Sequence, residues 1–177
     1  MPKYSTLKRL QLQATISNMK SAKELRRPGA HRLRFGRCSE KNRIYHVVTS
    51  TDGRETLFSN LYAGRLVVNA MQREDEAGHT TTLAFVVMPD HLHWLFRLNG
   101  SRSLSGTTGT MKSFSTRQIN SILGRRGRIW RPGFYDHAIR IDEVLVQVAR
   151  YIVANPLRAG IVTSMRHYAL WDSLWVD

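Results

Sequence analysis

The sequence predicts an α+β fold with the ferredoxin-like order of strand, helix, strand, strand, helix and strand. Short stretches rich in β-branched and aromatic residues alternate with two longer stretches whose apolar residues recur at helical spacing. The turn Pro89-Asp90 is short enough to join two strands as an antiparallel hairpin. We therefore expect an antiparallel sheet with helices on one face, followed by a C-terminal helix and preceded by a basic N-terminal arm.

The first three elements follow from residue type and spacing. Residues 44–49 are β-branched and aromatic, which favours a first strand. Apolar residues then recur at helical spacing from Leu57 to Met71, which predicts a helix. Residues 80–88 again favour a strand, and Pro89-Asp90 returns the chain into a third strand beside it.

This third strand contains two histidines, His91 and His93, separated by one residue. Because side chains alternate between faces along a strand, both imidazoles point to one face, while Leu92 and Trp94 point to the core. Two neutral imidazoles on a rigid strand supply two nitrogen ligands, which is half of a divalent-metal site. The alternative is that both histidines form only ordinary hydrogen bonds.

Two further elements complete the ferredoxin-like order. Residues 99–109 are rich in Ser, Thr and Gly, which predicts a loop, and the apolar spacing over residues 111–123 predicts the second helix. Residues 136–140 are expected to form the last strand.

A final helix is predicted from Val144 to about Ala154, with Asp142 as its N-cap. Tyr151 and Asn155 fall on nearly the same side of this helix, at the margin of its apolar stripe. A tyrosine in this position is either half-buried packing or a nucleophile, and the helix alone does not decide between them.

Composition points to nucleic acid as the partner. The chain has 177 residues, a hydrophobic content of 42% and a formal net charge of +14, which predicts one well-buried core and a polyanionic ligand. The first 43 residues contain twelve Lys or Arg and two acids, and this arm is either a DNA contact or a solvated tail. Without a signal segment or a long apolar run, a soluble intracellular protein is expected. The single cysteine, Cys38, is expected to be an inert thiol.

Cations and rings that suit phosphates and splayed bases occur in two regions, namely the end of the arm and the segment from the second helix to the last strand. The candidate DNA-binding residues are Arg34, Arg37, Lys112, Arg117, Arg125, Arg126, Arg128, Trp130, Arg131, His137 and Arg140. A core role for Trp130 is an equally good interpretation. His137 suits either a phosphate contact or a structural hydrogen bond.

Three motifs, in order along the chain, resemble the REP-associated tyrosine transposases, which belong to the single-tyrosine HUH nucleases. They are Met88-Pro89-Asp90-His91-Leu92-His93, Trp130 followed by Phe134-Tyr135-Asp136-His137, and Tyr151-Ile152 followed by Asn155-Pro156 and Ala159-Gly160. The resemblance covers roughly residues 33–162. It implies a catalytic domain over residues 38–165, between a basic arm at 1–37 and a tail at 166–177.

The resemblance also implies a chemistry. His91 and His93 become metal ligands, Asn155 the third ligand and Tyr151 the nucleophile. The expected ion is Mg²⁺ or Mn²⁺, and the expected reaction cleaves and rejoins single-stranded DNA at repetitive extragenic palindrome hairpins through a 5′-phosphotyrosine intermediate. A monomer in the bacterial cytoplasm, associated with the nucleoid, is favoured, and a dimer is the alternative.

Two other classes of function remain open at this point. One is a domesticated protein that binds DNA hairpins without cutting them. The other is a zinc-dependent hydrolase that uses His91 and His93, which needs a third His, Asp or Glu ligand. Only the nuclease forms a covalent bond to DNA.

Overall fold

The computed structural model describes residues 39–140 and 143–176. The arm at 1–37, with Arg34 and Arg37, lies outside the described residues, and so do Cys38 and Asp142. The elements of the ferredoxin-like order are β1 (Ile44–Ser50), α2 (Leu61–Glu76), β2 (Thr80–Met88), β3 (His91–Leu98), α3 (Leu104–Leu123) and β4 (Tyr135–Ala138). They follow one another in the predicted order, and the predicted α+β fold class is confirmed.

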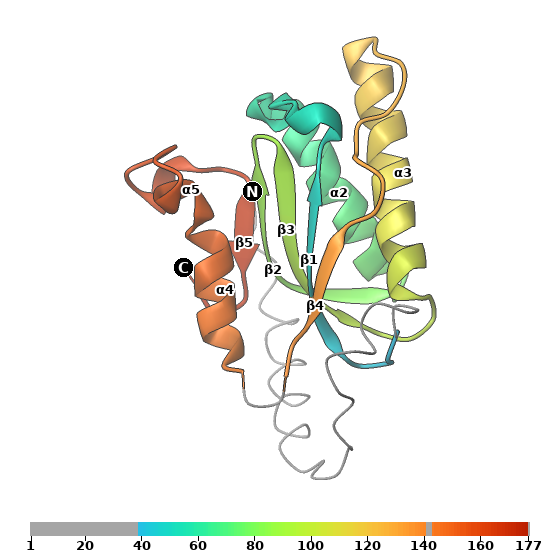
Figure 1. The fold of residues 1–177 in the computed structure, drawn as a ribbon, viewed down its shortest axis with the longest axis vertical. Coiled ribbons are helices and arrows are strands. Elements are labelled where there is room, and N and C mark those ends of the chain that lie inside the picture. The colour runs from blue at the N-terminus through green and yellow to red at the C-terminus, as the bar shows by residue number, and fades with distance from the viewer. Residues whose placement is uncertain (1–38, 141–142, 177) are drawn as a thin grey trace. The chain divides into compact units, whose positions relative to one another are not determined.

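A five-stranded antiparallel sheet forms the centre of the fold, with the strand order β4-β1-β3-β2-β5 (Figure 1). The β2–β3 hairpin turns at Pro89-Asp90, so that Met88 pairs with His91 and Val86 pairs with His93. Short 3₁₀ turns at Asp52–Arg54, Leu57–Ser59 and Met165–His167 connect the larger elements.

Two helices, α2 and α3, pack against each other beside one face of the sheet (Figure 1). Trp94, Phe96 and Val47 are fully buried on this face. Each helix begins at a side-chain cap: the Asn60 side chain accepts hydrogen bonds from two backbone N–H groups of α2, and Ser103 accepts one from α3.

The third long helix, α4 (Leu145–Val153), lies against β2 and β5 (Figure 1). Its buried residues are Ala149, Ile152 and Val153. Both faces of β2 are buried, and this strand contacts α2 as well as α4. Helices α2 and α4 therefore cover opposite faces of the sheet. On the face that α4 covers, most residues of β1 and β3 are only half-buried. The short helix α5 (Asn155–Arg158) continues from α4.

Besides shifts of a few residues at the ends of α2 and β4, three features differ from the sequence-based expectations. α3 begins at Leu104, within the expected loop, because Ser103 caps it and Thr107 and Thr108 are buried on its inner side. The N-cap position of α4 is occupied by Val144 without a side-chain hydrogen bond. The expected tail at 166–177 contributes a fifth strand, β5 (Trp171–Ser173), which pairs with β2.

Candidate active site

The sheet register places four histidines on the face opposite α2 and α3. Paired residues on neighbouring strands share a face, and His46 of β1 pairs directly with His137 of β4. Val48, two residues after His46, pairs with His93, and Ser50 pairs with His91. All four imidazoles therefore project from the side of the sheet on which α4 lies.

His91 and His93 form the centre of this group, with ring centroids 5.0 Å apart. The Nδ1–H of His91 donates to the Asp90 carboxylate at 2.5 Å, and Arg54 donates to the other oxygen of that carboxylate at 3.1 Å. Nδ1 of His93 lies 3.1 Å from Nε2 of His46. Each ring of the pair thus uses Nδ1 within the protein, which leaves Nε2 as the nitrogen that can bind a metal.

The electrostatics suit neutral ligands. Burial lowers the pKa of His93 to about 3, and the neighbouring rings of His46 and His91 add to the effect. Burial, together with His137, lowers the pKa of His46 to about 4. Burial alone would raise the pKa of Asp90, but hydrogen bonds and charges from His91 and Arg54 outweigh it and hold this pKa below its ordinary value. At neutral pH the imidazoles of His46 and His93 are therefore uncharged, and the Asp90 carboxylate is ionised.

Tyr151 and Asn155 occupy the end of α4 and the start of α5. The phenol is 53% exposed, and the Arg158 guanidinium lies 4.3 Å from its ring centroid. The amide nitrogen of Asn155 donates to the carbonyls of Tyr151 at 3.2 Å and Ile152 at 2.8 Å. These bonds fix the side chain and leave its amide oxygen as an acceptor or metal ligand.

The structure thus assembles two pairs, His91 with His93 and Tyr151 with Asn155. The second pair lies on helices that contact β2, the strand hydrogen-bonded to β3. Over residues 39–140 and 143–176, no group of three or more His, Cys, Asp or Glu side chains could hold a metal ion. Two imidazole nitrogens do not complete a divalent-metal site, so a further donor, such as the neutral oxygen Asn155 Oδ1, would be needed.

His137 has a structural partner. Its Nε2 lies 2.9 and 3.2 Å from the two carboxylate oxygens of Glu143, which also accepts a hydrogen bond from the backbone N–H of Arg140. Burial would raise the pKa of Glu143, but these two hydrogen bonds lower it below its ordinary value. Of the two roles considered for His137, the structural hydrogen bond is present.

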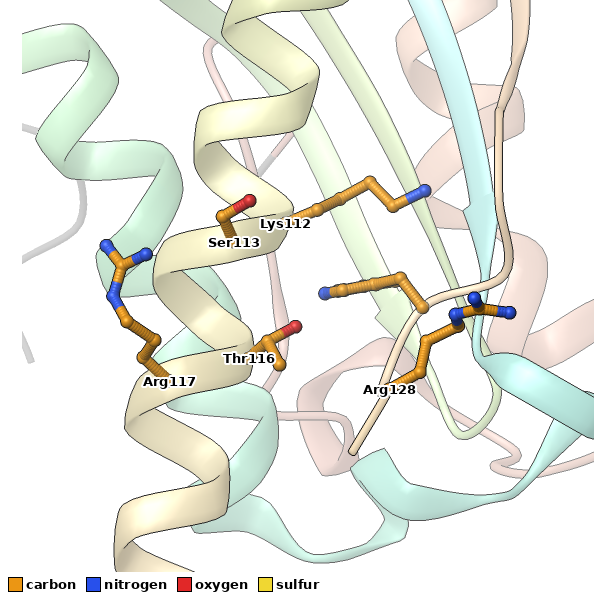
Figure 2. A pocket seen from close by; sticks show the side chains of 6 residues that line it. Lys112, Ser113, Thr116, Arg117 and Arg128 are labelled. Carbon is orange, nitrogen blue, oxygen red and sulfur yellow. The ribbon is translucent and has the colours of Figure 1, made fainter. Parts of the chain in front are cut away.

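The candidate DNA-binding cations gather along α3 and the segment that follows it. A hollow of ≈ 360 Å³ is lined there by Lys112, Ser113, Thr116, Arg117, Arg128 and Trp130 (Figure 2). Lys112 donates to the backbone carbonyls of Arg131 at 2.7 Å and Gly133 at 2.8 Å. Its ammonium group therefore holds this segment in place against α3.

The remaining cations of this group differ in their freedom to meet a phosphate. Arg117, Arg126, Arg128, Arg131 and Arg140 are exposed, whereas both guanidinium NH groups of Arg125 donate to the Glu55 carboxylate. The five exposed arginines could contact the DNA backbone directly. Arg125 could do so only after its ion pair with Glu55 opens.

Trp130 is buried in the core. Its side chain is 3% exposed, its Nε1–H donates to Ser115 Oγ at 3.0 Å, and its ring lies 5.0 Å from that of Phe58. A ring enclosed in this way cannot stack on a base, which favours the core interpretation of Trp130.

With this geometry established, comparison with known proteins places the chain in a family. Residues 39–155 match the model of the family described as "Transposase IS200 like". The chain belongs to this family. In the part of the IS200-like chain that the structure describes, no helix is long and apolar enough to cross a membrane.

Two proteins with related sequences or structures extend the comparison. A Haemophilus influenzae protein, provisionally named a REP-associated tyrosine transposase, is 29% identical over 97 residues, which are 49% of this chain and 55% of that protein. The IS200-like chain thus spans about half the length of that relative. A solved structure of a REP-associated tyrosine transposase bound to a REP hairpin has a TM-score of 0.63 and 22% identity, over 77% of this chain and 80% of that one. The first likeness confirms the resemblance read from the motifs, and the second confirms the fold.

Sequence reasoning about this IS200-like chain missed three participants. His46 bonds to His93, 47 residues away, and Glu143 bonds to His137, six residues away. Arg54 binds Asp90, whose carboxylate in turn accepts from His91. The alternation of His46 with the buried Tyr45 and Val47 was a usable signal, because it places His46 on the less buried face of β1.

Proposed function

We propose that this chain cleaves and rejoins single-stranded DNA beside hairpins, with Tyr151 as the nucleophile. The observation that carries the proposal is the shared face: α4, which bears Tyr151, covers the same side of the sheet from which His91 and His93 project. Membership of a transposase family supports a reaction on DNA.

The covalent step is a phosphoryl transfer. The Tyr151 phenol loses its proton, and its oxygen attacks the phosphorus of the scissile phosphodiester. The bond between this phosphorus and the 3′ oxygen of the preceding nucleotide breaks, and that oxygen takes up a proton to leave as a 3′ hydroxyl. The fragment downstream of the break stays attached to Tyr151 through its 5′ phosphate, as a phosphotyrosine ester. Because one phosphoester replaces another, attack by a 3′ hydroxyl reverses the step and rejoins the strand.

The chain's own residues prepare this reaction. Tyr151 is exposed enough for a strand to reach it, and Arg158 places a positive charge over its ring where an anionic phosphate must arrive. Nε2 of His91, Nε2 of His93 and Oδ1 of Asn155 would hold Mg²⁺ or Mn²⁺. When bound, the ion would supply Lewis-acid stabilisation of charge on the phosphate.

The proposed substrate is a hairpin with a single-stranded flank, as the solved relative was bound to a REP hairpin. The exposed arginines along α3 and after it would grip the phosphates, and Tyr151 would meet the unpaired strand. We further propose a monomer in the cytoplasm, with tyrosine and histidines from one chain.

Covalent capture tests the proposal. A hairpin oligonucleotide labelled 3′ to the cleavage site is incubated with the protein and Mn²⁺, and the adduct is resolved by denaturing electrophoresis. Tyr151→Phe removes one oxygen and should abolish the adduct while hairpin affinity stays within about three-fold. The matched control, Tyr135→Phe, removes the same atom from another exposed tyrosine and should leave the adduct intact.

Chelation by EDTA should also abolish the adduct. A wild-type protein that binds the hairpin tightly but forms no adduct in Mn²⁺ would favour the non-cutting hairpin-binding protein. Full adduct formation in EDTA would contradict the role of the histidine pair.

A further inference from the structure

His46 is a half-buried neighbour of the proposed metal ligands. It lies on β1, two pairs along the ladder from the Val48–His93 pair and therefore on the same face of the sheet. Its Nε2 is 3.1 Å from Nδ1 of His93, and the two rings stack at 22° with centroids 5.3 Å apart. A hydrogen bond combined with stacking fixes both the tilt and the rotation of the His93 ring.

The direction of this hydrogen bond decides whether His93 can bind a metal. If His46 Nε2–H donates, Nδ1 of His93 is the acceptor, and the single ring proton of a neutral His93 sits on Nε2. That nitrogen then has no lone pair for a metal. If His93 Nδ1–H donates to His46 instead, Nε2 of His93 presents a lone pair, and the proton of His46 sits on its own Nδ1.

We propose that His46 is the positioning residue that selects the metal-binding tautomer of His93, by accepting the hydrogen bond from its Nδ1. This inference rests on the proposed function, because it assigns His46 to the same site. It is distinct from the role of Asp90, which cannot donate when ionised and therefore fixes the tautomer of His91 unconditionally. His46, by contrast, can accept the hydrogen bond from His93 only in the tautomer that has its own proton on Nδ1.

Metal affinity provides the first test. Mn²⁺ binding to the full chain with bound hairpin is measured by electron paramagnetic resonance of the free ion. His46→Leu removes the acceptor at similar volume and should weaken Mn²⁺ binding by about 10- to 100-fold. His46→Gln can place an amide oxygen near the position of Nε2 and should restore affinity to within about three-fold of wild type.

The matched control is His79→Leu. His79 is bonded to Ser101 and precedes β2 at the end away from the β2–β3 turn, so this variant should bind Mn²⁺ as wild type does. Unfolding curves for each variant verify that the protein is folded. Equal Mn²⁺ affinity in folded His46→Leu and wild type would overturn the inference, and so would a loss in His46→Gln as large as in His46→Leu.

A tautomer measurement distinguishes positioning from simple packing. Long-range ¹H–¹⁵N spectra of the histidine-labelled chain with hairpin and Mg²⁺ should show the His93 proton on Nδ1 and the His46 proton also on Nδ1. A His93 proton on Nε2 would overturn the inference. Wild-type protein that binds Mn²⁺ but forms no covalent adduct would refute the proposed function and leave the His46 assignment standing, whereas wild-type protein that binds no Mn²⁺ would refute both.

Discussion

The hollow on α3 makes a quantitative prediction about DNA affinity. Arg117 and Arg128 line it from two different segments, and both are exposed (Figure 2). Within the described residues neither belongs to an ion pair. Each can therefore neutralise one phosphate of a duplex stem and release its counterions, which contributes about 0.9 to the slope of log affinity against log salt.

The double variant Arg117→Ala/Arg128→Ala should reduce the magnitude of this slope by about 1.8. Hairpin affinity would be measured by fluorescence anisotropy between about 50 and 200 mM salt, the range over which such slopes are usually resolved. Arg125→Ala should reduce the slope by less than either single variant, because Arg125 already pairs with Glu55. Arg65→Ala, on the exposed side of α2, controls for the loss of charge alone. An unchanged slope in the double variant would show that the stem does not pass over this hollow.

Three other outcomes follow from the sequence and the fold. Deletion of residues 1–37 should leave a folded protein that still cuts a short single strand at high concentration. This protein should bind the hairpin more weakly, with a shallower slope of log affinity against log salt. Identical affinity and slope would show that the arm does not contact the DNA. Trp130→Ala should lower the free energy of unfolding by about 3 to 5 kcal/mol in denaturant titrations, with Tyr135→Ala within about 0.5 kcal/mol of wild type; equal stability of the two variants would contradict the core assignment. Folding lowers the pKa of His46 from 6.5 to about 4 and that of His93 from 6.5 to about 3, so the unfolded chain binds protons first as pH falls below 6.5. The metal-free protein should therefore lose stability between pH 6.5 and 4, and the double variant His46→Leu/His93→Leu should lose it less steeply. Parallel curves of stability against pH for the two proteins would refute these shifts.

The sequence predicted the fold well wherever one periodicity dominated. The β2–β3 hairpin was readable because Pro89-Asp90 interrupts two apolar strands. The start of α3 was not, because Ser, Thr and Gly are typical of loops, and only the tertiary burial of Thr107 and Thr108 makes residues from Leu104 onwards helical. β5 was missed because three residues carry too little pattern to predict a strand without its partner, β2.

In the candidate site, too, the sequence predicted the local features and missed the contacts between distant residues. His91 and His93 lie two residues apart, so alternation alone predicted a shared face, as the register shows. His46 is 47 residues from His93, and its hydrogen bond exists only because β1 pairs with β3 in one register. Trp130 lies in a basic, aromatic stretch that resembles a base-stacking surface, and burial against Phe58 and Ser115 became visible only in the folded chain.

The most direct test of the central claim is to locate the covalent bond to DNA. Trypsin cuts after Arg150 and Arg158, which isolates Tyr151 as the one tyrosine of the peptide 151–158, whereas Tyr135 falls in the peptide 129–140 because the Arg131–Pro132 bond resists cleavage. Wild-type protein is trapped with a hairpin oligonucleotide in Mn²⁺ and digested, and the peptides are analysed by mass spectrometry. The proposed function predicts the 5′-phosphorylated fragment on peptide 151–158. A nucleotide adduct on peptide 129–140, or on any peptide other than 151–158, would contradict it.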